Sequence, residues 1–289
     1  MDNDDLTAQV LARTGAAADP RMVEFVRTLV PHLHAFVREF RPTQDEWATG
    51  IAFLTETGQR CDATRQEFIL LSDVLGVSML VDEINNVGLT GVTESTVLGP
   101  FHVDGAPHRE LGADIGAGGG RPLVVAGTVR SSDGAPLAGA ELDVWQADSE
   151  GYYDVQRTTG GTDLRARFTC AADGTYWFRT RLPKWYAIPD DGPVGKLLRT
   201  TDRHPNRPAH IHFIASAPAH RPVTTHAFLA DSPYLDSDAV FGVKAGLIRP
   251  VETIDDAAEA ARFDVSAPFE LLRFDISLAG VSSRWRQCS

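Results

Sequence analysis

The pattern of apolar residues changes near Val92, and this change limits the possible fold more than any other feature of the chain. Before it, apolar residues return every three or four positions, as on one face of an amphipathic helix. After it, short β-rich runs alternate with Pro, Gly, Thr and Asp, as in strands joined by turns. The sequence therefore predicts a mainly β protein with a helical N-terminal domain over residues 1–95 and a β-sandwich domain over residues 96–289.

Helical signals divide the first domain. Residues 21–40 have the periodicity of one amphipathic helix, which Pro31 is expected to kink or divide. Capping boxes of the form Thr-x-x-Glu open two further helices, at Thr43 and Thr64. Residues 77–86 predict one more short helix. Such a helical layer must bury its apolar faces on the rest of the chain or on a second subunit.

Seven β-rich runs follow the change of pattern. They cover residues 122–130, 141–147, 165–170, 175–180, 208–215, 223–229 and 269–276. Asp-Gly pairs at 133–134 and 173–174 are hairpin-type turn signals between neighbouring runs. Residues 239–247 and 255–262 have patterns typical of short helices. Short strands separated by turns at this spacing favour a sandwich.

Composition limits the partners and the compartment. The net charge of −12 argues against nucleic acid and anionic membranes as partners, and no apolar run reaches the roughly 18 residues of a membrane span. The acidic stretch 1–5 differs from a secretory signal, so we expect a cytoplasmic protein. Cys61, Cys170 and Cys288 have neither metal-type spacing nor the number expected of a disulfide framework.

Two histidines on one predicted strand are candidate metal ligands. His210 and His212 are two residues apart, so they lie on the same face of the strand, with Cα atoms roughly 6–7 Å apart. Ile211 and Phe213 face the other way, into apolar packing. The His-x-His pattern is weak by itself, because two histidines also occur on polar strand faces without a metal.

Two tyrosines add a second kind of ligand. Tyr153 and Tyr186 each follow a predicted strand and lie among turn residues. A tyrosine binds metals well only as phenolate, and its usual pKa near 10 opposes ionisation. A trivalent cation reverses this preference, so two phenolates and two imidazoles suit Fe(III) better than Zn(II) or Cu(I). The alternative is that both are ordinary aromatics at an interface or at the edge of the core.

Five segments carry a resemblance to a known family. They are residues 94–101 (ESTVLGPF), 145–154 (WQADSEGYYD), 185–189 (WYAIP), 203–212 (RHPNRPAHIH) and 224–228 (TTHAF). In these segments the chain resembles the intradiol ring-cleavage dioxygenases, and the resemblance extends over nearly the whole chain. It implies a homodimer joined through the N-terminal helices, with a phospholipid between those helices in some relatives.

The resemblance also implies a site. A non-haem Fe(III), one per subunit, would be held by Tyr153, Tyr186, His210 and His212. Tyr186 would also accept a proton from the substrate, and Arg207 would lie over the substrate ring. These roles belong to the family's pattern, and they match this chain position by position.

The expected substrates are a small aromatic diol or triol and O₂. His226 stands where catechol-cleaving relatives carry glutamine, so the chain is similar to the hydroxyquinol-cleaving branch. That branch converts 1,2,4-trihydroxybenzene to 3-hydroxy-cis,cis-muconate, equivalent to maleylacetate. Expected pocket residues are Leu80, Asp82, Pro100, Phe101 and Val243. Asp82 is either the partner of the third ring hydroxyl or a helix-surface carboxylate.

Three other functions stay open. Within the family, the alternative is a catechol or chlorocatechol 1,2-dioxygenase. A non-catalytic β-sandwich binding module fits the turn-rich segment 125–140, but it needs neither the tyrosines nor the histidines. A zinc hydrolase using His210 and His212 lacks a nearby acidic residue in a ligand-like motif.

Overall fold

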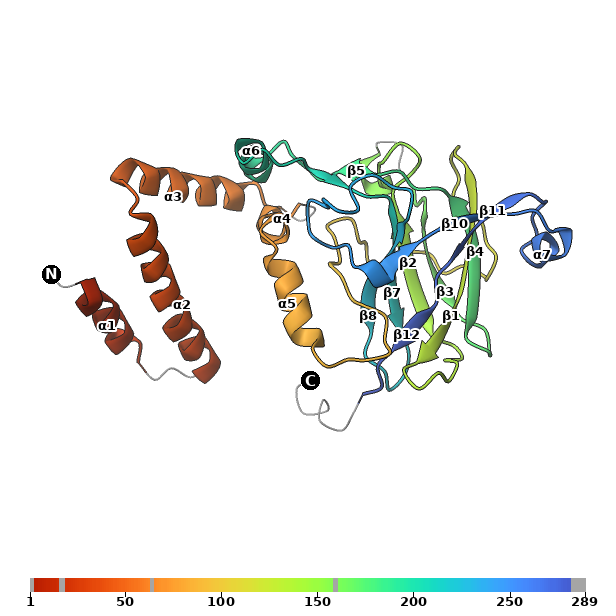
Figure 1. Ribbon diagram of the computed structural model, residues 1–289, viewed down its shortest axis with the longest axis horizontal. Helices are drawn as coiled ribbons and strands as arrows, with labels where there is room; N and C mark the ends of the chain where they lie inside the picture. The colour runs from red at the N-terminus through yellow and green to blue at the C-terminus, as the bar shows by residue number, and fades with distance from the viewer. Residues whose placement is uncertain (1–2, 16–18, 63–64, 158–160, 282–289) are drawn as a thin grey trace. The chain divides into compact units, whose positions relative to one another are not determined.

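The computed structural model describes residues 3–15, 19–62, 65–157 and 161–281 (Figure 1). The chain divides into two compact units, Met1–Glu56 and Thr57–Ser289. Thr64 of the second capping box and Cys288 lie outside the described residues. No helix in the described part of the chain is long and apolar enough to cross a membrane.

The first unit is helical, as the sequence predicts. It contains α1 (Asn3–Arg13), α2 (Pro20–Phe40) and most of α3 (Gln44–Gln59), which continues past the boundary. Thr43 and Glu46 form the expected capping box, with Glu46 N donating to Thr43 Oγ1 and Thr43 N to Glu46 Oε2.

Pro31 lies inside α2, which continues as one helix, so of the two expected outcomes, a kink or a division, the division is wrong. A proline removes only its own hydrogen bond to the preceding turn, and the turns on either side can continue the helix.

Besides a short helix near the C-terminus, described below, the described part of the second unit contains three further helices. They are α4 (Glu67–Val74), α5 (Val77–Asn86) and α6 (Pro193–Thr200), of which α5 matches the predicted range and α6 was not expected. The buried Glu67 carboxylate accepts from Val194 N at 3.1 Å, which joins α4 to the first turn of α6. This contact helps explain why the compact unit begins before α4, well before residue 95.

Two five-stranded sheets form the sandwich. The first sheet contains β1 (Pro122–Ser131), β4 (Thr175–Arg181), β10 (Val251–Ile254), β11 (Phe269–Arg273) and β12 (Ile276–Leu278). The second has the order β3 (Arg165–Thr169), β2 (Glu141–Gln146), β7 (His210–Ser216), β8 (Val223–Leu229) and β9 (Ile248–Arg249). The predicted sandwich is confirmed, and both sheets are visible in Figure 1.

The core lies between the sheets. One continuous cluster of buried residues takes Val125 from β1, Phe178 from β4, and Ile211 and Phe213 from β7. Because side chains alternate along a strand, the intervening positions of β7 point to the opposite face of the second sheet. That outer face also carries the short ribbon of β5 (Tyr186–Ala187) paired with β6 (Asn206–Arg207), whose Arg207 contacts His210.

The short helix predicted over residues 239–247 is not present. These residues form turns and the 3-10 helix η2 (Ala245–Leu247) instead of a helix. The Asp238 carboxylate accepts from Val240 N and Gly242 N, and Phe241 has a left-handed φ of 58°, so the backbone bends away from helical geometry. The other expected short helix is present as α7 (Ala257–Arg262), with Asp256 as its N-cap.

Candidate metal centre

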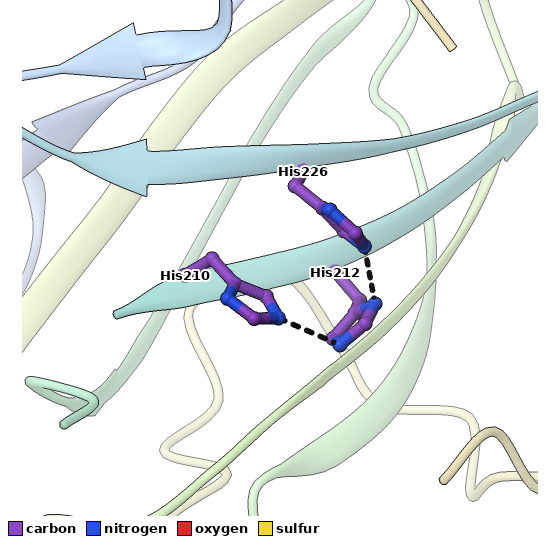
Figure 2. Close-up of side chains that lie close together, drawn as sticks. All are labelled: His210, His212 and His226. Atoms are coloured by element: carbon purple, nitrogen blue, oxygen red, sulfur yellow. Dashed lines mark hydrogen bonds between the residues drawn. The ribbon is translucent and has the colours of Figure 1, made fainter. Parts of the chain in front are cut away.

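Three histidines meet on the outer face of the second sheet. His210 and His212 come from β7, and His226 comes from β8 directly opposite His212 in the antiparallel register (Figure 2). All three are buried. Each offers a ring nitrogen within 4.8 Å of the others, and no second group of three such residues occurs in the described ranges.

Hydrogen bonds decide which ring nitrogen of His210 is available. Its Nδ1 lies 2.7 Å from the Pro208 carbonyl oxygen, which can only accept, so Nδ1 carries the proton. The lone pair is therefore on Nε2. This nitrogen lies 3.1 Å from His212 Nε2, so the two histidines direct the same atom to one point.

His226 contacts the opposite side of His212. Its Nε2 lies 2.7 Å from His212 Nδ1, and its Nδ1 lies 2.8 Å from Thr96 Oγ1. His226 therefore does not share the point at which the Nε2 atoms of His210 and His212 meet, although the three rings are neighbours. If His212 binds a cation through Nε2, its Nδ1–H donates to His226, and this contact fixes the tautomer.

A tyrosine hydroxyl also lies near the Nε2 atoms of His210 and His212. Tyr153, fully buried in the segment after β2, places its hydroxyl 2.9 Å from His212 Nε2. Tyr186 lies across from it, with ring centroids 5.2 Å apart and planes at 86°. Arg207, paired with Tyr186 in the β5–β6 ribbon, places Nη1 3.5 Å from the Tyr186 hydroxyl and 3.4 Å from His210 Nε2.

Burial sets the protonation of these groups. It lowers the pKa of His210, His212 and His226 well below the usual value, so the imidazoles are neutral and can act as ligands. Burial, helped by the neighbouring Tyr186, raises the pKa of Tyr153 well above 10. Without a cation this phenol keeps its proton. The donor set thus fits a highly charged hard cation, which stabilises phenolate and accepts neutral imidazole.

Aromatic side chains enclose the centre. Phe101 stacks on Tyr153 with centroids 4.5 Å apart, and Trp145 stacks on His212 at 4.5 Å. Gly99 has a φ of 77°, and a Cβ there would lie 3.2 Å from His212 Cε1, so a side chain would be both strained and crowded. These contacts hold the rings in fixed orientations.

The remaining expected pocket residues lie in different surroundings. Leu80 is 56% exposed on α5, and Pro100, next to Phe101, is half-buried. Asp82 Oδ2 pairs with Lys244 Nζ at 3.0 Å, and both residues line a cavity of about 680 Å³. Val243 is half-buried and lines a different cavity, of about 410 Å³.

Sequence reasoning did not single out Thr96, Trp145 or Asp238 as members of the site. Thr96 lines the larger cavity and reaches His226 from a segment without regular structure. Asp238 pairs with Arg207 through both carboxylate oxygens, and both side chains are 2% exposed. Thr96 and Trp145 lie in segments that resemble the family, but none of the three residues has a spacing that points to a role.

Comparison with known proteins identifies the family. A sequence model described as "Dioxygenase" matches residues 97–280, and one described as "Catechol dioxygenase N terminus" matches residues 19–91. The hydroxyquinol 1,2-dioxygenase of Rhizobium sp. (strain MTP-10005) is 51% identical over 254 residues, which cover 87% of this chain and 86% of the relative. The chain belongs to the intradiol dioxygenase family.

Solved structures of intradiol dioxygenases have the same fold. The crystal structure of hydroxyquinol 1,2-dioxygenase from Pseudomonas putida DLL-E4 superposes with a TM-score of 0.90 at 42% identity, covering 96% of this chain and 99% of that one. Catechol 1,2-dioxygenase from Acinetobacter radioresistens superposes with a TM-score of 0.85 at 28% identity, covering 98% and 94%. The family is that of an enzyme, so the binding module and the zinc hydrolase are no longer needed as explanations.

Proposed function

We propose that this intradiol dioxygenase cleaves hydroxyquinol, 1,2,4-trihydroxybenzene, between its two adjacent hydroxyl-bearing carbons. Both atoms of O₂ enter the product, 3-hydroxy-cis,cis-muconate, which is equivalent to maleylacetate. Because the aromatic ring is opened, the reaction belongs to aromatic catabolism. The observation that carries the proposal is the meeting of the Tyr153 hydroxyl with the Nε2 atoms of His210 and His212 within 2.9–3.1 Å. The 51% identity to a hydroxyquinol 1,2-dioxygenase supports this substrate over catechol.

The proposed cofactor is one non-haem Fe(III) per subunit. Its ligands would be Tyr153, Tyr186, His210 and His212, whose donor set fits a trivalent ion. When bound, the iron supplies a Lewis acid and a template on which the two adjacent hydroxyl groups of the substrate are oriented. The two phenolates balance most of the ion's charge while both histidines stay neutral, as their burial requires.

Tyr186 and Arg207 are proposed to act on the substrate. The Tyr186 oxygen accepts a proton as the substrate hydroxyl ionises, and Arg207 Nη1, 3.5 Å from it, stabilises negative charge on that side. A guanidinium remains charged and can stack on a planar ring, which suits Arg207 to the substrate and to its dicarboxylate product. His226 and Thr96 are proposed to hold the imidazole of His212 in the ligating tautomer.

Asp82 remains the proposed partner of the third ring hydroxyl. Its pairing with Lys244 and a hydrogen bond from Asn86 Nδ2 fix its carboxylate beside the 680 Å³ cavity, where it has polar neighbours and room for a ligand. Leu80, Pro100, Phe101 and Val243 are the other proposed pocket residues, of which Val243 lines the separate 410 Å³ cavity. Catechol or chlorocatechol cleavage is the second candidate, because the structure of a catechol 1,2-dioxygenase superposes well.

Substrate preference tests this assignment. The iron-loaded enzyme is expected to have a kcat/KM for hydroxyquinol at least tenfold above that for catechol, since a site built for a hydroxyl can reject the analogue lacking it by up to about 10⁴–10⁵. Oxygen uptake, with identification of the ring-opened product, measures the kcat/KM for each substrate. Asp82→Asn should reduce the ratio of the kcat/KM for hydroxyquinol to that for catechol. A preference for catechol would contradict the proposed substrate, and failure to cleave either compound would contradict the proposed function.

A domain boundary near residue 95 and a homodimer joined through the N-terminal helices complete the proposal. The two family models divide between residues 91 and 97, which supports the boundary. Apolar side chains on α2 support the dimer, because Phe25, Phe36 and Phe40 are 57–61% exposed in the single chain. A phospholipid bound at this apolar surface belongs to the same proposal. Sedimentation tests the dimer, and lipid extraction tests the bound phospholipid. The cytoplasmic location stays a prediction.

A further inference from the structure

Arg207 uses only part of its guanidinium toward the metal centre. Its Nε donates to Asp238 Oδ1 at 3.0 Å and its Nη2 to Asp238 Oδ2 at 3.2 Å, so one edge is taken by a bidentate contact. The remaining nitrogen, Nη1, is the one that lies near the Tyr186 hydroxyl and His210 Nε2. The guanidinium is planar and rigid, so fixing one edge also fixes the direction of the other.

Asp238 is held in place by groups other than Arg207. Its Oδ2 accepts from Gly242 N at 3.0 Å, and its Oδ1 accepts from Val240 N at 3.4 Å. The adjacent Ala239 N donates to the Asn206 carbonyl at 3.1 Å, and Ala239 O accepts from Arg203 Nη2 at 3.1 Å. The carboxylate is therefore a fixed anchor, and the longer arginine side chain is the part that it orients.

Gly242 leaves the space in which the two side chains meet. A Cβ at this position would lie 3.0 Å from Arg207 Nη2 and 3.2 Å from Asp238 Oδ2. The next nearest atom, Thr96 Oγ1, is at 3.8 Å, so a methyl group would crowd the ion pair and push the two partners apart.

The pairing also solves an electrostatic problem. A guanidinium that is 2% exposed has lost nearly all contact with water, and an unpaired charge there is costly. Asp238 compensates it, so the pair as a whole carries no net charge. The centre thereby gains an oriented N–H edge without an additional uncompensated cation beside the metal ligands.

We propose that Asp238 is a positioning residue that holds Arg207 with its Nη1 edge directed at the substrate's place beside Tyr186. The inference rests on the proposed function, because it states what the orientation of Arg207 is for. Asp238 itself touches Arg207 and backbone amides, and it acts on the reaction through the arginine alone.

The test compares four iron-loaded variants with the wild-type enzyme: Asp238→Asn, Arg207→Met, the double variant, and Asp236→Asn, an exposed carboxylate on the same segment as a control. We measure kcat and KM for hydroxyquinol, and the affinity for anaerobic hydroxyquinol from the shift of the visible charge-transfer band. Asp238→Asn is expected to lower kcat/KM by roughly 10–100-fold and to weaken anaerobic binding, with the resting band unchanged. Asp236→Asn should match wild type.

The double variant separates positioning from a general structural role. If Asp238 acts only through Arg207, the double variant is no worse than Arg207→Met, whereas independent effects multiply. Multiplying losses, or wild-type kinetics and binding in Asp238→Asn, would overturn the inference. A wild-type enzyme that shows neither the band nor hydroxyquinol cleavage would instead overturn the proposed function.

A second variant covers the case in which Asp238→Asn does not fold. Gly242→Ala keeps both charges and every hydrogen-bonding atom, and it crowds only the contact between the partners. The same loss of anaerobic substrate affinity is expected. Wild-type affinity and kinetics in Gly242→Ala would contradict the proposed positioning.

Discussion

Replacing Tyr153 with phenylalanine is expected to remove nearly all activity and to weaken iron binding by more than the roughly 10–100-fold that outer-shell partners of a metal typically cost. The change deletes a single oxygen, which lies 2.9 Å from His212 Nε2. Phenylalanine fills the same buried space and keeps the stacking on Phe101, so the lost hydrogen bond costs about 0.5–1.5 kcal/mol of stability. The variant should therefore fold but have almost no activity.

The neighbouring tyrosine is a matched control. Tyr152 is 49% exposed and stacks beneath the Arg157 guanidinium. Tyr152→Phe removes the same atom one position earlier, and its activity and iron content are expected to stay within about twofold of wild type. Iron analysis, steady-state kinetics and urea unfolding of both variants measure the difference. Equal behaviour of the two variants would show that Tyr153 is not a ligand.

Replacing His226 with leucine is expected to lower iron affinity or kcat/KM by roughly 10–100-fold. Leucine has a similar size but cannot accept the proton of His212 Nδ1, which lies 2.7 Å from His226 Nε2. A buried donor is then left without a partner, which costs about 1–3 kcal/mol, and His212 loses the contact that selects its tautomer. Thr96 also loses its contact with His226 Nδ1.

His226→Gln is the companion variant. A glutamine oxygen can accept from His212 Nδ1, and glutamine is the residue that the resemblance assigns to catechol-cleaving relatives at this position. It should therefore keep most of the iron affinity that leucine loses. Competition with a chelator measures the affinity of each variant. Wild-type affinity in His226→Leu would contradict the proposed role.

The elements that the sequence predicts best are those with a complete local pattern. Residues 77–86 and 223–229 were predicted at both ends, because each has a strong period and clear turn signals on its flanks. Residues 239–247 have apolar spacing typical of a helix, but Phe241 has a left-handed φ of 58°, through which a helix cannot continue. Helix α6 contacts Glu67, 127 positions earlier, and no local pattern reveals that contact.

The candidate site also contains some residues that the sequence predicts and others that only the folded structure reveals. The sequence predicted His210, His212 and Tyr153 as neighbours, and the structure brings them together. The position of His226 behind His212 follows from the register of β7 and β8, which sequence spacing does not supply. Asp238 is a polar residue in a loop, and it gains its role only when the chain brings it to Arg207, 31 positions away.

The visible absorption spectrum of the purified, iron-loaded protein tests the central claim most directly. With Tyr153 and Tyr186 as ligands of Fe(III), the protein is expected to be red, with one iron per subunit and a phenolate-to-iron charge-transfer band. The band should shift when hydroxyquinol is added without oxygen. A protein that stays colourless after iron loading would contradict tyrosinate ligation and, with it, the proposed chemistry of the site.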